Sequence, residues 1–495
     1  MDRRRFLLAT GTTATAAWMG MGRTIAQMPS AETTPAPKSE KPSTPLEQRL
    51  AQFAAGIHYE DLPKETVLAC KRFLLDALAC AIGAVDTAPA RIAEETFRKA
   101  FASAGSSTII GKPQLISTEG ATLINGTLIR ELEFNDIYFG KDPAHPSEIL
   151  STALACCEEA GRSGRDLIEA MVVGYEIEVR LADAFSWASR GFISSSAAGF
   201  VAPLVAGKAW RMPAEQMAHA VGICGPRQLI PLAVNSGDIS MMKSIQPGFA
   251  AMDAVFSTRL AAAGLTGVTR SIEWMAANIQ PKDNGVSVDL DPSHYLLTKV
   301  GLRRFSLQGD LQAMAEAGVN LHPKVRGQTG AIKEVIVQTY PETIHRGVAS
   351  PERYHPASRL TADHSLPICL AIALLDGDVT IRQFNDGRWK APEVLALAQK
   401  VKVEVGDSLV SQMPNGHGTI VEVHLDNGQV IKETILIPEG DAERPMSRPA
   451  MENKFRQFAD SVLGKAGASN VLSYVDRLEE IKDIRTFTAA LRKPA

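Results

Sequence analysis

Acidic and imidazole side chains lie close together in one stretch of the chain. Glu133, Asn135 and Asp136 lie near the end of a predicted helix, and His145 follows in a Gly/Pro-rich loop. Pro146 suits the first turn of a second helix, because its missing N–H has no partner there. Carboxylates and imidazoles accept and donate protons, so a loop held between two helices indicates acid–base chemistry.

The helices that must hold this loop are indicated by apolar residues at helical spacing, with Gly or Pro at the connections. They are predicted at residues 63–82, 89–104, 118–134, 146–160, 164–185, 195–210, 213–223 and 247–263. No predicted strand precedes a G-x-G-x-x-G motif, which argues against a dinucleotide-binding fold. Residues 46–280 are therefore predicted to form an all-helical domain.

The pattern changes after about residue 280, where apolar and polar residues alternate with period two. Strands are predicted at residues 331–340, 401–405, 418–424 and 430–437, with helices at 311–317, 365–375 and 392–399 between them. Asp426-Asn427-Gly428 is a typical hairpin turn between the last two strands. We expect a mainly α protein, with a smaller α+β lid domain at 281–440 and C-terminal helices at 441–495 that pack on the helical domain.

The first 26 residues indicate export. Arg3, Arg4 and Arg5 precede a weakly apolar run rich in Gly, Ala and Thr, and RRRFL is similar to a twin-arginine signal. Residues 27–45 are rich in Pro, Ser, Thr and Lys and predict a disordered linker. We expect a periplasmic protein that does not stay at the membrane after removal of the signal, because later apolar runs are too short to span one.

Composition narrows the classes of partner. The chain has 495 residues, 45% of them hydrophobic, and a net charge of −3, without a basic run that would suggest nucleic acid. The six cysteines form no C-x-x-C pair, so buried free thiols are expected and an iron–sulfur cluster is not. Neither zinc-ligand spacing nor a glycine-rich nucleotide loop is present. A small molecule is the expected partner, with no metal or cofactor.

From about Leu46 onward the chain resembles the MmgE/PrpD family. The family's N-G…H-x-L-D-F-D-D…H-P segment corresponds to residues 125–146, and its G-x-S-G…G-Y-E-x-x-x-R segment to residues 161–180. Members include 2-methylcitrate dehydratase, cis-aconitate decarboxylase and iminodisuccinate epimerase. The resemblance implies a homodimer in which a pocket between the helical body and the lid takes a small polycarboxylate.

The resemblance also implies roles for the acidic stretch. Glu133 stands where the family has its leading catalytic aspartate, and it is one methylene longer. Asn135 replaces a second aspartate, whereas Asp136 and His145 are retained. Glu133 and His145 are thus the expected catalytic acid or base, with Asn135 and Asp136 near the substrate. The alternative is a solvated helix end with a histidine that only orders its loop.

Cationic residues are expected to hold the substrate. Lys243 matches a K-x-x-x-x-G motif before a helix predicted to begin at Pro247, a position favourable to a carboxylate. The alternative for Lys243 is an ordinary surface lysine. Arg303 and Arg304 stand in the family's Lys-x-(Phe/Tyr)-Pro segment, and a guanidinium has a fork suited to carboxylates.

Several proton-transfer positions depart from the family pattern. Ile193 and Gln308 stand where histidines are expected, and Ile368 stands in place of a tyrosine, which leaves His364 as the nearest polar neighbour. An isoleucine cannot transfer a proton. We therefore expect a metal-free lyase, of the hydro-lyase type of 2-methylcitrate dehydratase. The open alternatives are a carboxylate-binding protein without turnover and an isomerase or epimerase, for which one acid and one base suffice.

Overall fold

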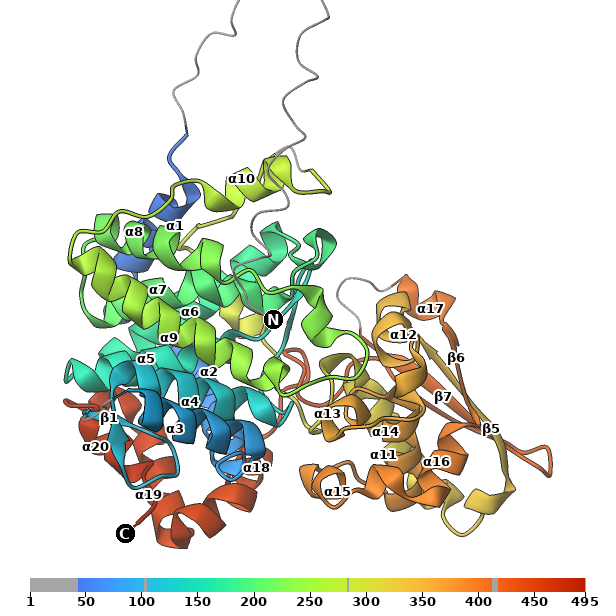
Figure 1. Ribbon diagram of the computed structural model, residues 1–495. Coiled ribbons are helices and arrows are strands. Elements are labelled where there is room, and N and C mark those ends of the chain that lie inside the picture. The colour runs from blue at the N-terminus through green and yellow to red at the C-terminus, as the bar shows by residue number, and fades with distance from the viewer. Residues whose placement is uncertain (1–42, 102–104, 283–284, 412–416, 495) are drawn as a thin grey trace, which may run out of the picture. The chain divides into compact units, whose positions relative to one another are not determined.

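A computed structural model describes residues 43–101, 105–282, 285–411 and 417–494 (Figure 1). The predicted signal at 1–26 and the predicted linker up to residue 42 lie outside the described residues. The described chain is mainly helical with one four-stranded sheet, which confirms the predicted fold class. In this part of the chain, we found no helix with the length and apolarity that crossing a membrane requires.

The first part of the described chain is built from helices. They are α1 (Leu46–Gly56), α2 (Lys64–Gly83), α3 (Ala88–Ala100), α4 (Thr118–Glu131), α5 (Leu150–Glu159), α6 (Gly164–Ala184), α7 (Ala198–Ala209), α8 (Ala214–Cys224), α9 (Met242–Ala262) and α10 (Ser271–Asn278). Local sequence fixes some ends firmly. For example, Ser163 and Asp166 form a capping box that starts α6.

Two short antiparallel strand pairs interrupt these helices. They are β1 (Ser107–Thr108) with β2 (Leu115–Ile116), and β3 (Tyr138–Phe139) with β4 (Pro143–Ala144). Two-residue strands are too short to show a period-two pattern, so the sequence did not indicate them. The second pair matters for function, because it shapes the loop between Asp136 and His145.

The four-stranded sheet has the order β6-β5-β7-β8. Its strands are β5 (Ile332–Thr339), β6 (Val401–Val405), β7 (Thr419–Leu425) and β8 (Val430–Ile435), with β5 and β6 parallel and the other pairs antiparallel. The predicted hairpin turn is confirmed, and Gly428 supplies its positive φ of 85°. Alternate valines of β5 and β7 are buried against α11 (Gln312–Val325), α14 (Leu366–Asp376) and α16 (Pro392–Ala398).

The remaining helices are α12 (Pro341–Gly347), α13 (Arg359–Ala362), α15 (Ile381–Asn385), α17 (Asp407–Val410), α18 (Arg448–Val462), α19 (Gly464–Asp476) and α20 (Arg485–Ala490). Apolar residues from α18 to α20 share one buried core with those of α1 to α9, while residues between 305 and 435 form a second. Residues 45–495 nevertheless form one compact unit. The predicted domain boundaries at 280 and 440 stay predictions.

Two helix ends near the predicted site differ from expectation. α4 ends at Glu131 rather than at residue 134, because Glu133 adopts a left-handed backbone with a φ of 49°. α9 begins at Met242 rather than at Pro247, and it continues through that proline. The prediction for α9 followed the preference of proline for first turns. As a result, Lys243 belongs to the first turn of α9 itself.

Candidate active site

Glu133 is the centre of a buried charged cluster that joins four separate segments of the chain. Its Oε1 accepts hydrogen bonds from Arg130 Nη1 at 2.7 Å and from Lys243 Nζ. Its Oε2 accepts one from Arg303 Nη1 at 2.9 Å. Glu133, Lys243 and Arg303 are 3%, 6% and 0% exposed, so these ion pairs form away from bulk water.

The close packing of α4 and α9 sets the distance between Glu133 and Lys243. A β-carbon added to Gly126 of α4 would lie 2.8 Å from the Cα of Gly248 in α9, and one added to Gly248 would collide with the carbonyl oxygen of Leu123. The two glycines therefore let the helix backbones approach closely. This contact brings the first turn of α9 to the end of α4.

Arg303 lies between the Glu133 side of the cluster and His145. Its Nη1 also donates to the carbonyl oxygens of Glu133, at 2.9 Å, and Leu307, at 3.1 Å, and its Nη2 lies 3.2 Å from His145 Nδ1. His145 Nδ1 lies closer, at 2.8 Å, to the carbonyl oxygen of Asp136. The shorter contact assigns the Nδ1 proton to that carbonyl, which leaves Nε2 of the partly exposed ring as the base.

His364 reaches the cluster from the other side of Lys243. Its Nε2 lies 2.7 Å from Lys243 Nζ, and its Nδ1 lies 2.5 Å from Asp363 Oδ1. Arg359 in turn bonds Asp363 Oδ2 at 3.0 Å and Glu131 Oε1 at 2.7 Å. The segment between α13 and α14 is thereby tied to the end of α4.

A second group of buried acids, Asp136 and Glu148, lies next to the cluster. Asp136 accepts hydrogen bonds from the Ser147 backbone N–H at 3.0 Å and from the Ser147 hydroxyl at 2.6 Å. Glu148 binds Arg130 Nε at 3.0 Å and the Ser195 hydroxyl at 2.8 Å. Asn135 joins the two groups, because its Nδ2 donates to the Ser147 hydroxyl and its Oδ1 lies 3.4 Å from Arg303 Nη2.

Burial and neighbouring charges perturb the pKa values of these groups in different directions. Burial alone would raise the pKa of Glu133, but Arg130, Lys243 and Arg303 hold it well below its usual range, which makes Glu133 a weak base. Burial lowers the pKa of Lys243 to about 8, against the attraction of Glu133. Burial, together with Arg130 and Arg303, lowers the pKa of His145 well below its usual value.

Burial also shifts the pKa values of His364 and Asp136. Burial lowers the pKa of His364, and the positive charge of Lys243 lowers it further. Burial raises the pKa of Asp136 to about 7, because the hydrogen bonds from Ser147 only partly offset the loss of water. At neutral pH both histidines are therefore uncharged, and Lys243 and Asp136 are the predicted site residues with pKa values near 7 to 8.

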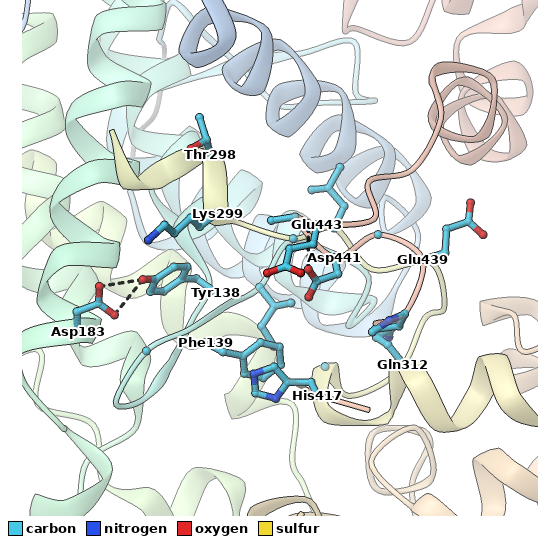
Figure 2. A pocket seen from close by; sticks show the side chains of 18 of the residues that line it. Tyr138, Phe139, Asp183, Thr298, Lys299, Gln312, His417, Glu439, Asp441 and Glu443 are labelled. Atoms are coloured by element: carbon cyan, nitrogen blue, oxygen red, sulfur yellow. Dashed lines mark hydrogen bonds between the residues drawn. The ribbon is translucent and has the colours of Figure 1, made fainter. Parts of the chain in front are cut away.

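A cavity of about 770 Å³ is lined by residues next to the cluster in sequence, including Ile137 and Leu302 (Figure 2). Its wall carries the stacked rings of Phe139 and His417, whose centroids lie 3.6 Å apart, and Tyr138, which donates to Asp183. None of the eight residues predicted for the site lines this cavity. In the described structure the polar side chains of all of them except Arg304 contact the buried cluster instead.

Seven of the eight predicted residues belong to this network, namely Glu133, Asn135, Asp136, His145, Lys243, Arg303 and His364. Arg304 does not share their contacts, because it pairs with Glu439 at 3.0 Å and is partly exposed. The reading of Lys243 as an ordinary surface lysine is excluded by its burial. In the described residues no group of three or more His, Cys, Asp or Glu side chains is arranged to hold a metal ion.

Sequence reasoning missed Arg130, Glu148, Arg359 and Asp363. Arg130 lies three residues before Glu133, a helical spacing that could have indicated a pair. Asp363 precedes His364 directly, so it could have been named with it. Arg359 lies four residues before Asp363, which is also a helical spacing, but its pairing with Glu131 left no sign in the sequence. The sequence held no comparable sign for Glu148.

Fold and site together define a mainly helical protein whose two buried cores jointly build one charged site. The chain belongs to the MmgE/PrpD family: residues 48–278 match the MmgE/PrpD N-terminal domain and residues 305–480 match the C-terminal domain. Six of the seven residues of the network lie within the two matched ranges, and Arg303 falls in the short interval between them.

Curated relatives match over most of the chain at low identity. Cis-aconitate decarboxylase of Aspergillus terreus is 25% identical over 476 residues, which cover 90% of this chain and 95% of that protein. The Homo sapiens cis-aconitate decarboxylase is 26% identical, over 90% of this chain and 94% of its own. A 2-methylcitrate dehydratase of Escherichia coli is 22% identical over 56% of this chain and 60% of its own. Decarboxylases and dehydratases are both lyases.

Proposed function

We propose that the protein is a lyase that acts on a small polycarboxylate at the Glu133 cluster. One observation carries the proposal: Arg130, Lys243 and Arg303 come from three segments and converge on a single carboxylate. Arg130 is shared with Glu148, so Glu133 is the carboxylate that balances both Lys243 and Arg303, which leaves a site that favours a further anion. A substrate carboxylate would bind Lys243 and Arg303 in competition with Glu133.

Unpartnered polar atoms support the presence of a ligand or water here. Arg303 Nε and Gln308 Oε1 are buried with no hydrogen-bond partner among the described residues, as are both amide atoms of Gln246, one turn after Lys243 in α9. Buried polar atoms are rarely left unsatisfied. The oxygen atoms of a polycarboxylate could accept from the two donors, Arg303 Nε and Gln246 Nε2, and a substrate hydroxyl or a water molecule could donate to the two amide oxygens.

The pKa pattern favours decarboxylation. In that reaction a carbon–carbon bond breaks, carbon dioxide leaves, and the electron pair stays on carbon until a proton replaces the lost group. The cations would stabilise the developing negative charge, and the Lys243 ammonium, with a pKa of about 8, could give up the proton. The relatives that cover 90% of this chain are decarboxylases.

Dehydration is the second candidate, and it needs a base as well as an acid. His145 Nε2 could take the proton from carbon, while Lys243 protonates the leaving hydroxide. The expected hydro-lyase activity stays a prediction. Binding without turnover is the third candidate function. It is supported by Ile193 and Ile368, which are both buried and cannot transfer protons.

Turnover assays separate these candidates. Cis-aconitate, 2-methylcitrate and citrate would each be incubated with the purified full-length protein, and products would be followed by proton NMR together with carbon dioxide release. We expect one acid to be consumed, with at least about a hundredfold loss in Lys243→Met. Arg304→Met is the matched control and should keep activity. A thermal shift without product for every acid would favour simple binding and contradict the lyase.

We also propose that the protein is exported and works as a homodimer. The similarity of RRRFL to a twin-arginine signal supports export, and the family resemblance supports the dimer. Replacing Arg3, Arg4 and Arg5 by lysine should retain the protein in the cytoplasm on cell fractionation. Sedimentation of the mature protein should give twice the chain mass.

A further inference from the structure

The two ring nitrogens of His364 face partners of opposite character. Nδ1 lies 2.5 Å from Asp363 Oδ1 and 2.8 Å from the carbonyl oxygen of Leu360, and both of these oxygens accept hydrogen bonds. Nδ1 therefore carries the proton, and Nε2 presents its lone pair. The group 2.7 Å from Nε2 is Lys243 Nζ, which is a donor. Asp363, His364 and Lys243 thus form a directed chain of hydrogen bonds.

Asp363 is itself held firmly. Its Oδ2 accepts from Arg359 at 3.0 Å, its carbonyl oxygen accepts from the Gln308 N–H at 3.0 Å, and its side chain is fully buried. Arg359 also binds both the carbonyl oxygen and the carboxylate of Glu131 at the end of α4. The carboxylate that orients the histidine therefore cannot turn away without breaking several buried contacts.

We propose that Asp363 and His364 are positioning residues that act through Lys243. His364 holds the Lys243 ammonium by accepting its hydrogen bond at Nε2, and Asp363 fixes the tautomer in which that is possible. The pair thereby controls the pH at which the ammonium releases its proton. The inference deepens the proposed function, since it rests on Lys243 as the proton donor of that site.

Several charged or titratable groups act on Lys243 together. Arg130 belongs to α4, Glu133 to the loop after α4 and Arg303 to the segment before α11. Asp363 and His364 belong to the segment between α13 and α14. A neutral acceptor and a nearby negative charge both favour the charged form of an amine. Loss of His364 or Asp363 should therefore let Lys243 lose its proton at lower pH, while Glu133 stays in place.

The test is a titration of Lys243 that needs no substrate. Full-length deuterated protein carrying ¹³C,¹⁵N-lysine would be followed by NMR between pH 6 and 10, with Lys243→Arg used to assign the side-chain signal. We expect a midpoint near pH 8 in the wild type. In His364→Phe it should fall by roughly one pH unit, because the acceptor is lost. In His364→Gln, whose amide oxygen can accept the same bond, it should stay near the wild-type value.

Asp363→Asn should lower the midpoint in the same direction. If that variant fails to fold, the comparison of His364→Phe with His364→Gln still decides the question. His322→Phe is the control, since His322 bonds the carbonyl oxygen of Leu374. A midpoint equal to that of the wild type in folded His364→Phe would overturn the proposal. A shifted midpoint without turnover of any acid would support the positioning role of Asp363 and His364 and contradict the lyase proposal. Turnover with an unshifted midpoint would support the lyase proposal and contradict the positioning role.

Discussion

Glu133 combines a strained backbone with an unusual concentration of charge. A φ of 49° is uncommon for a residue other than glycine and costs on the order of 1 kcal/mol. In that conformation its carboxylate meets Arg130, Lys243 and Arg303 at once. We infer that Glu133 balances the cations when no substrate is bound, and its expected role as catalytic acid or base stays a prediction.

Glu133→Gln should therefore have two opposite effects. The free energy of unfolding should fall by about 3 kcal/mol, because the buried cations Lys243 and Arg303 lose their countercharge and Arg130 keeps only Glu148. The rise in melting temperature on adding citrate should grow, because the internal competitor is weakened. Urea denaturation and thermal shift measure the two effects. Glu439→Gln, which removes an exposed partner of Arg304, is the control, and an unchanged response to citrate would argue against competition.

Asp136 gives a prediction for the pH dependence of stability. Its pKa is about 7 in the folded protein and roughly 3.9 in an unfolded chain, so the folded state binds the extra proton between about pH 4 and pH 7. This proton adds to the free energy of unfolding of the wild type. The contribution is fully present at about pH 4 and is lost as the pH rises through 7. Asp136→Asn lacks this contribution, because an amide does not titrate.

The stability of the wild type relative to Asp136→Asn should thus fall by up to about 4 kcal/mol between pH 4 and pH 8. Urea unfolding at several pH values gives the difference. Asp426→Asn, in the exposed hairpin turn, should follow the wild type. A constant difference between wild type and Asp136→Asn would mean that this carboxyl is already ionised in the folded state at low pH.

At the scale of elements, most long helices were readable from sequence, whereas α1, α10 and the helix ends next to the site were not. Apolar spacing predicted α2, α6 and α14 well, because each is buried along most of its length. The ends that matter for the site follow from tertiary contacts. α4 stops where Glu133 turns toward its cations, and α9 starts early because it packs against α4 at Gly248.

Gly248→Ala tests whether that packing sets the site. The added methyl group would collide with the Leu123 carbonyl oxygen, so α9 must shift away from α4 and carry Lys243 away from Glu133. We expect a loss of about 1–3 kcal/mol in the free energy of unfolding and loss of the stabilisation by citrate. Gly56→Ala, where a β-carbon meets nothing within 4 Å, is the matched control. Full citrate stabilisation in Gly248→Ala would show that the site tolerates the shift.

At the scale of the whole molecule, the site depends on contacts between distant parts of the chain. Family resemblance located seven of its residues, because short motifs survive where chemistry constrains them. Several of the ion pairs that hold those motifs could not be predicted, since Lys243–Glu133, Arg303–Glu133 and Arg359–Glu131 each join residues more than a hundred positions apart. Lys454 of α18 is an example: it pairs with Asp76 of α2 at 2.6 Å and donates to the carbonyl oxygens of Phe134 and Arg303, at 2.6 and 2.8 Å.

Lys454 therefore ties the C-terminal helices to both backbone segments that carry Glu133 and Arg303. Lys454→Met should lower the free energy of unfolding by about 3 kcal/mol, because Asp76 is left buried without its partner. Adding Asp76→Asn should recover part of that loss, since the unpaired charge is then removed. Arg456→Met, at a half-buried pair on the same helix, should cost no more than about 1 kcal/mol. Urea denaturation of the wild type, Lys454→Met, Asp76→Asn and the double variant completes the double-mutant cycle. Equal losses in Lys454→Met and in the double variant would mean that the packing of the lysine stem, and not its charge, holds the C-terminal helices to the site.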